Sequence, residues 1–194
     1  SEWLSYDENM NVTFDEDKVK EWMREFGKTY DTVGSTRTIT TPTGKTVNVS
    51  GGTYGWSVDE ATEATALIES IKKGEVIEKE PTYVQTAATH DAQDWGSTYA
   101  EVDVTTQHMW YIVNGAIALE TDVVTGLPDA KHATPAGVYS ILYTEPDSKL
   151  IGEKDPETGK PIYETYVRYW MPFTYQGHGF HDADWQPAFG GSRY

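Results

Sequence analysis

The segment Gly177-His178-Gly179-Phe180-His181-Asp182-Ala183-Asp184-Trp185 brings together two histidines, two acids and a tryptophan. Its glycines free the backbone and argue against a helix, so we expect it to contain the end of a strand. Such a concentration of ionisable groups is typical of a functional site. His181 is the candidate base, because a neutral imidazole near pH 7 takes up a proton and later returns it. Residues three apart in an extended segment point to opposite faces, so His178 and His181 are not expected to share a task.

Other roles remain open for the same residues. His181 could be a surface histidine beside acids, and His178 could be structural or line a substrate. Trp185 could pack in the core or in a lid, as aromatic side chains often do. The H-x-x-H-D-x-D pattern holds enough nitrogen and oxygen donors for zinc or manganese. Two histidines at this spacing share a side only on a helix, however, so we expect no metal and no other cofactor.

The composition limits the class of protein. The 194 residues are 38% hydrophobic and 13% aromatic, enough for one large or two small folded domains. No apolar run has the length of a membrane span, and no signal segment opens the sequence. The formal net charge of −16 excludes nucleic acid as a partner, because phosphate binding depends on Lys and Arg. The sequence contains no Cys, which excludes disulfides and Cys-ligated zinc within these residues.

Residues 1–88 are predicted to form a small α+β module. Apolar residues three or four apart predict an amphipathic helix over residues 15–30. Thr- and Val-rich arms around a Pro-Thr-Gly-Lys turn predict a hairpin over residues 36–49. Ser57-Val58-Asp59-Glu60 has the form of a capping box, and the helix after it is expected to end at Gly74.

Residues 89–194 are predicted to form a mostly antiparallel β domain, a sandwich or a partial barrel, so the chain belongs to the α+β class. Apolar and polar residues alternate there, and Asn114-Gly115 is a strong hairpin signal. Because the predicted sheet ends close to Trp185, we expect the domain to be C-terminally incomplete. Strands are expected over residues 100–104, 109–113, 117–123, 138–143 and 162–170, with a polar turn at 155–160.

A set of motifs follows in a fixed order from Tyr99 to Trp185. These are Val124-Thr125-Gly126, Thr134-Pro135-Ala136-Gly137, Tyr169-Trp170-Met171-Pro172-Phe173, His181-Asp182 and Trp185. The ordered set resembles the L,D-transpeptidases (YkuD-like catalytic domain), cysteine enzymes that cross-link peptidoglycan. Gly52-Thr53-Tyr54-Gly55-Trp56, ahead of a capped helix, resembles the peptidoglycan-binding domain that often precedes them.

The resemblance implies covalent catalysis by a cysteine thiolate. In the family, the thiolate attacks the carbonyl between the third stem-peptide residue and D-alanine, and an acceptor amine then resolves the thioester into a 3-3 cross-link. His181 matches the position of the base. The thiol belongs to a Ser-His-Gly-Cys motif further along, whereas this sequence ends at Tyr194, so the 194 residues alone are expected to be inactive. The residues expected to line the substrate are Tyr169, Met171, Gln176, Gly177, His178, Gly179, Asp182 and Trp185.

The resemblance also implies a partner and a location. The partner would be the peptidoglycan stem peptides, in the extracellular space or cell envelope of a bacterium, in cell wall biogenesis and cell shape, with β-lactams as inhibitors. A membrane anchor would lie upstream of Ser1, and no particular oligomeric state is implied.

Two other classes stay open. One is a non-catalytic wall-binding module, in which Tyr54 and Trp56 form a sugar-stacking platform rather than a buried hinge. The other is a β-rich extracellular adhesion or scaffold protein. A Ser-His-Gly-Cys motif in the reading frame past Tyr194 would favour the enzyme, and a stop codon would favour the binding module.

Overall fold

The structure is a computed structural model that describes residues 3–194. The chain divides into two compact units, Ser1–Gly96 and Ser97–Tyr194. The domain ranges 1–88 and 89–194, which rest on sequence alone, stay a prediction.

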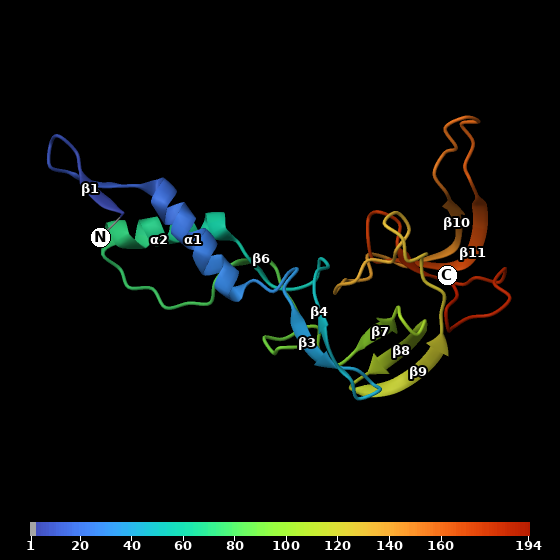
Figure 1. The fold of residues 1–194 in the computed structure, drawn as a ribbon. Coiled ribbons are helices and arrows are strands. Elements are labelled where there is room, and N and C mark those ends of the chain that lie inside the picture. Colours follow the sequence, from blue (N-terminus) through green and yellow to red (C-terminus); the bar gives the residue numbers. More distant parts are fainter. Residues whose placement is uncertain (1–2) are drawn as a thin grey trace. The chain divides into compact units, whose positions relative to one another are not determined.

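Two helices form the core of the first unit, and they pack against each other (Figure 1). Helix α1 (Glu16–Tyr30) begins where the side chain of Asp15 accepts a hydrogen bond from the Lys18 amide. Its buried face meets helix α2 (Glu60–Lys73), because both helices place apolar residues four positions apart on one side. The shared core consists of Val19, Met23, Ala64 and Ile68. The predicted helix over residues 15–30 is confirmed.

The start of α2 corrects the predicted capping box. The N-cap is Asp59, whose carboxylate accepts hydrogen bonds from the amide and hydroxyl of Thr62. Ser57 is not free to cap the helix, because it belongs to a short strand, β5 (Ser57–Val58), that pairs with β6 (Tyr83–Gln85). The predicted end at Gly74 is confirmed. This residue takes the left-handed conformation at φ 67°, and its amide donates a hydrogen bond to the Ile71 carbonyl oxygen.

Hairpins complete the first unit. β1 (Leu4–Tyr6) pairs with β2 (Val12–Phe14), and β3 (Arg37–Thr40) pairs with β4 (Thr46–Val49). The second pair confirms the hairpin predicted over residues 36–49.

A buried network ties the end of the first unit to its hairpin. Arg37 Nη2 lies 2.9 Å from Asp94 Oδ2, and the two side chains are only 3% and 2% exposed. Asp94 also accepts a hydrogen bond from Thr32. Tyr54 and Trp56 serve the same segment: the Tyr54 hydroxyl accepts the Ala88 amide, and the Trp56 indole donates to the Thr89 carbonyl. These contacts favour the buried hinge over the sugar-stacking platform for the two aromatic residues.

Two separate three-stranded antiparallel sheets make up the second unit (Figure 1). The first contains β7 (Tyr99–Asp103), β8 (His108–Val113) and β9 (Ala116–Asp122), with Asn114-Gly115 at the β8–β9 turn. The second has the order β10 (Glu145–Ile151), β11 (Glu164–Pro172) and β12 (Gly179–His181). Among residues 3–194 the sheets close into no barrel, and the α+β class is confirmed.

The strand predicted over residues 138–143 is wrong. That segment has no strand pairing beyond a bridge at Val138, although the Leu142 amide donates to the Pro172 carbonyl. The strand that precedes β11 and pairs with it is β10, which contains Pro146 and several polar residues. The predicted polar turn is confirmed: Asp155 accepts the amides of Glu157 and Thr158 at the tip of the β10–β11 hairpin. Within the described range no helix is both long and apolar enough to cross a membrane.

Candidate active site

Strand β12 places His181 directly opposite Trp170 of β11. Cross-strand partners share one face of a sheet, so the imidazole lies beside the indole, with ring centroids 5.9 Å apart. The imidazole also stacks on Trp185, at 5.8 Å and an interplanar angle of 23°. The imidazole therefore has two indole neighbours, and His181 is nevertheless exposed.

One hydrogen bond defines the protonation of the neutral ring. His181 Nδ1 lies 2.9 Å from the backbone carbonyl oxygen of Asp182. A carbonyl oxygen only accepts, so Nδ1 carries the hydrogen and donates it. Nε2 then bears the lone pair, which is the arrangement that a general base requires.

The carboxylate of Asp182 is directed at β11. Its Oδ1 accepts the backbone amides of Arg168 at 2.8 Å and Tyr169 at 3.0 Å, and its Oδ2 accepts Arg168 Nε at 3.1 Å. Burial raises the pKa of this carboxyl, but the hydrogen bonds from Tyr169 and Arg168 outweigh it and hold the pKa below the ordinary value. Arg168 Nη2 also contacts both carboxylate oxygens of Asp184, at 2.7 and 2.9 Å.

Gly179 is needed for the close packing of β12 on β11. A Cβ at this position would stand 2.7 Å from Pro172 Cα and 2.7 Å from the Trp170 ring, distances that no real Cβ tolerates. Gly177 serves the turn instead, with φ at +95°, a region that favours glycine.

His178 and His181 lie in different environments. His178 Nδ1 lies 2.8 Å from the Thr174 hydroxyl, which also accepts the His178 amide at 3.1 Å. The ring stacks on Phe173. His178 thus holds the turn before β12 together, and Gln176 lies exposed within that turn.

Tyr169 and Met171 lie on the face of β11 opposite to Trp170, because side chains alternate along a strand. The structure therefore does not bring these two residues to the face that carries His181. Asp182 and Trp185 do contact the imidazole, and Gly179 lies two residues before it on the same strand.

The two acids of the H-x-x-H-D-x-D pattern are both partners of Arg168. Over residues 3–194 no group of three or more His, Asp or Glu side chains is arranged to hold a metal ion. Sequence reasoning missed Arg168. The signal in the sequence was a single arginine on the strand predicted over residues 162–170, ahead of the two acids Asp182 and Asp184 that could pair with it.

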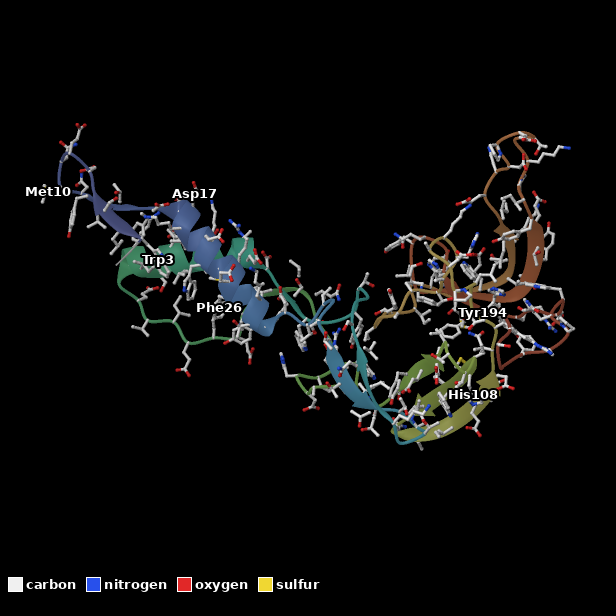
Figure 2. The ribbon with its side chains drawn as sticks, viewed as in Figure 1. Trp3, Met10, Asp17, Phe26, His108 and Tyr194 are labelled. Atoms are coloured by element: carbon white, nitrogen blue, oxygen red, sulfur yellow. The ribbon has the colours of Figure 1, made fainter. Side chains whose placement is uncertain are left out.

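A second polar cluster lies on the β7–β8–β9 sheet, around His108 (Figure 2). His108 Nδ1 lies 2.8 Å from Asp122, and the Trp110 indole donates to Glu120 at 3.1 Å. On the neighbouring strand, burial raises the pKa of Glu101. The His108 and Trp110 side chains thus find their hydrogen-bond partners within the sheet. One buried carboxylate oxygen of Glu101 has no hydrogen-bond partner among the described residues.

Comparison with protein families identifies both units. The model of the "L,D-transpeptidase catalytic domain" matches residues 97–193, and that of the "Putative peptidoglycan binding domain" matches residues 2–78. No curated protein matches the chain.

Two solved structures are similar over nearly the whole chain. The Ldtfm-avibactam carbamoyl enzyme is 36% identical with a TM-score of 0.73, over 98% of this chain and 72% of that one. The C442S mutant of the Enterococcus faecium L,D-transpeptidase is also 36% identical, with a TM-score of 0.72, over 97% and 73% of the two chains. The chain belongs to the L,D-transpeptidase family. It carries the catalytic domain of this family of peptidoglycan transferases, preceded by a peptidoglycan-binding domain, and the predicted family and domain order are confirmed.

Proposed function

We propose that the second unit provides the base of a cysteine acyl-transfer site, and that this base is Nε2 of His181. The observation that carries the proposal is the hydrogen bond from Nδ1 to the Asp182 carbonyl, because it leaves Nε2 with a lone pair on an exposed ring. The thiol is not among the 194 residues, which contain no cysteine. We assign it to a Ser-His-Gly-Cys segment outside them.

The proposed reaction has two steps. First, Nε2 takes the thiol proton, the sulfur forms a bond to the carbonyl carbon of the third stem-peptide residue, and the C–N bond to D-alanine breaks. The leaving amine takes the proton from the imidazolium. An acceptor amine then attacks the thioester, gives a proton to Nε2, and releases the thiolate as the 3-3 cross-link forms.

The substrate would lie along the His181 face of the β11–β12 pair. Gly177, Gly179 and Trp185 border this face, whereas His178 would act through the turn that it holds. Tyr169, Met171 and Gln176 would contact only parts of the stem peptide that extend past the strand pair. Such a protein would work outside the cytoplasm, in the cell envelope, would contribute to cell shape, and would be a target of β-lactams.

Acylation by a carbapenem tests the role of His181. A protein extended through the Ser-His-Gly-Cys segment should form a covalent adduct, detected by intact mass. His181→Ala should slow the adduct by about 10²–10⁴-fold, the usual contribution of general base catalysis. His132→Ala is a matched control, because His132 is an exposed histidine outside the β11–β12 pair whose ring is paired with Asp129.

The opposite results would refute the assignment. A folded, Cys-containing protein that forms no adduct would exclude the reaction. An equal loss of rate in His181→Ala and His132→Ala would exclude His181 as the base.

We also propose that residues 1–88 bind the glycan part of peptidoglycan through a row of aromatic rings on α1. Trp22, Phe26 and Tyr30 are four residues apart, with ring centroids 5.4 and 4.7 Å apart, and Trp3 continues the row at 5.3 Å from Trp22. Trp3 and Phe26 are labelled in Figure 2. Trp22 and Tyr30 are each 43% exposed, so their rings are available for stacking on sugars.

Pull-down with purified sacculi tests this surface with the 194-residue protein. Trp22→Ala and Tyr30→Ala should each weaken binding several-fold. Tyr6→Ala is the control, because Tyr6 is an exposed tyrosine of the same unit outside the row. Equal binding by all three variants would exclude the aromatic row.

A further inference from the structure

Arg168 connects the two carboxylates that follow His181 to strand β11. We propose that Arg168 is a positioning residue: through Asp182 and Asp184 it holds the backbone after β12 in place and so determines which nitrogen of His181 carries the proton. The proposal rests on the role of His181 as the base. It concerns the orientation of the base and adds no catalytic group.

The first step concerns the acceptor of the imidazole. His181 Nδ1 donates to the carbonyl oxygen of the next residue, Asp182. The β11–β12 pairing ends with the pair of Trp170 and His181, so no strand hydrogen bond fixes the peptide that carries this oxygen. If that peptide rotated, the Nδ1 proton would lose its acceptor.

The second step concerns what fixes that peptide. The Asp182 carboxylate accepts the amides of Arg168 and Tyr169, at 2.8 and 3.0 Å. It thus extends the attachment to β11 by one residue beyond the strand pairing. The anionic form is the one that accepts all these bonds, and the pKa of Asp182 lies below its ordinary value.

The third step concerns charge. The Arg168 guanidinium contacts Asp182 through Nε at 3.1 Å and Asp184 through Nη2 at 2.7 Å. Without this cation two carboxylates would remain side by side in a chain whose net charge is −16, and their repulsion would favour separation. The Arg168 and Tyr169 amides would then hold Asp182 against that repulsion without help from the cation, and the peptide that carries the Nδ1 acceptor would rotate more freely.

Exposure distinguishes this role from a merely structural one. Arg168 and Asp184 are 63% and 75% exposed, and ion pairs this exposed contribute little to global stability. Loss of Arg168 should therefore leave the folding of the second unit almost unchanged, while the neutral tautomer of His181 changes.

¹⁵N NMR of the imidazole nitrogens in the 194-residue protein measures the tautomer directly. In the parent protein the neutral ring of His181 should be mainly the Nδ1–H form. In Arg168→Ala the Nε2–H form should become the major one, and Arg168→Lys should lie between, because an ammonium cannot reproduce the two-sided contact of a guanidinium. Lys149→Ala is the matched control: it removes an exposed ion pair with Glu164 on the β10–β11 pair and should change nothing at His181.

Three results would overturn the proposal. These are a parent ring that is mainly Nε2–H, an Arg168→Ala ring that stays mainly Nδ1–H, and an equal change in Lys149→Ala. If Arg168→Ala does not fold, Arg168→Gln replaces it, and an unchanged tautomer there overturns the proposal equally. NMR needs no thiol, so failure of the tautomer test is distinct from failure of the carbapenem test.

Discussion

The buried pair of Arg37 and Asp94 supports the sharpest stability prediction. Replacing Arg37 by Ala leaves a carboxylate that is 2% exposed without its cation. Removing one partner of a buried pair costs about 3–5 kcal/mol, because the remaining charge stays out of water. We expect a loss of about 3 kcal/mol, at the lower end, because Arg37 Nε and Asp94 Oδ1 have no hydrogen-bond partner among the described residues and the pair is not fully satisfied.

Urea unfolding followed by helical circular dichroism measures this loss. Both described helices lie in the first unit, so the signal reports that unit. With a slope of about 1–2 kcal/mol per molar urea, a loss of about 3 kcal/mol lowers the midpoint by roughly 2 M. Arg24→Ala is the control: Arg24 lies 2.7 Å from Glu21, but both side chains are more than half exposed, so its loss should cost below about 1 kcal/mol.

The double variant Arg37→Met/Asp94→Leu tests the mechanism. Replacing the whole pair by apolar residues removes the uncompensated charge, so most of the lost stability should return. The reasoning is refuted if Arg37→Ala costs no more than Arg24→Ala, or if the double variant is less stable than Arg37→Ala.

Three further predictions concern single residues. Gly179→Ala should destabilise the second unit by about 1–3 kcal/mol in chemical unfolding, because its Cβ overlaps Trp170; an unchanged midpoint would contradict this packing. Burial raises the pKa of Glu63, yet hydrogen bonds, first from Lys79, hold it below the ordinary value. Glu63 therefore stabilises the first unit above the pKa of the unfolded chain, and this stability is lost as pH falls through the lower folded pKa, so Glu63→Gln should flatten the acid limb of a stability–pH curve. The pKa of Glu101 is raised by burial, so its charged form opposes folding: Glu101→Gln should stabilise the second unit at pH 7, and a gain that persisted at low pH would contradict this explanation.

Local sequence signals predicted the helices and most hairpins. Asn114, Gly115 and Gly74 all tolerate the positive φ that these turns and caps require, and the structure uses it. Capping was less certain, because Ser57 and Asp59 are both good N-cap residues. The choice depended on β5 pairing with β6, a contact about 25 residues away that no local pattern contains.

Strand β10 was missed for a related reason. A proline has no amide to donate to a neighbouring strand, so Pro146 argued against a strand when the sequence was read alone. β10 is an edge strand in the order β10-β11-β12, so the missing amide of Pro146 is tolerated there.

The candidate site could be proposed in part from the sequence. His181 and its neighbours were proposed because they lie within nine residues of sequence. Arg168 is 14 residues from Asp182, and the face that it shares with His181 depends on strand register, which the sequence does not specify.

The closeness of His181 to Trp170 and Trp185 has a practical consequence. Indole emission is quenched by a nearby imidazolium more than by a neutral imidazole, so a charge on this ring should dim these two residues. Trp56 and Trp110 also lie beside histidines, His90 and His108, so replacing those two tryptophans by Phe removes the competing signal. The resulting protein would contain its own unlabelled optical probe of the charge on this ring, readable by steady-state fluorescence.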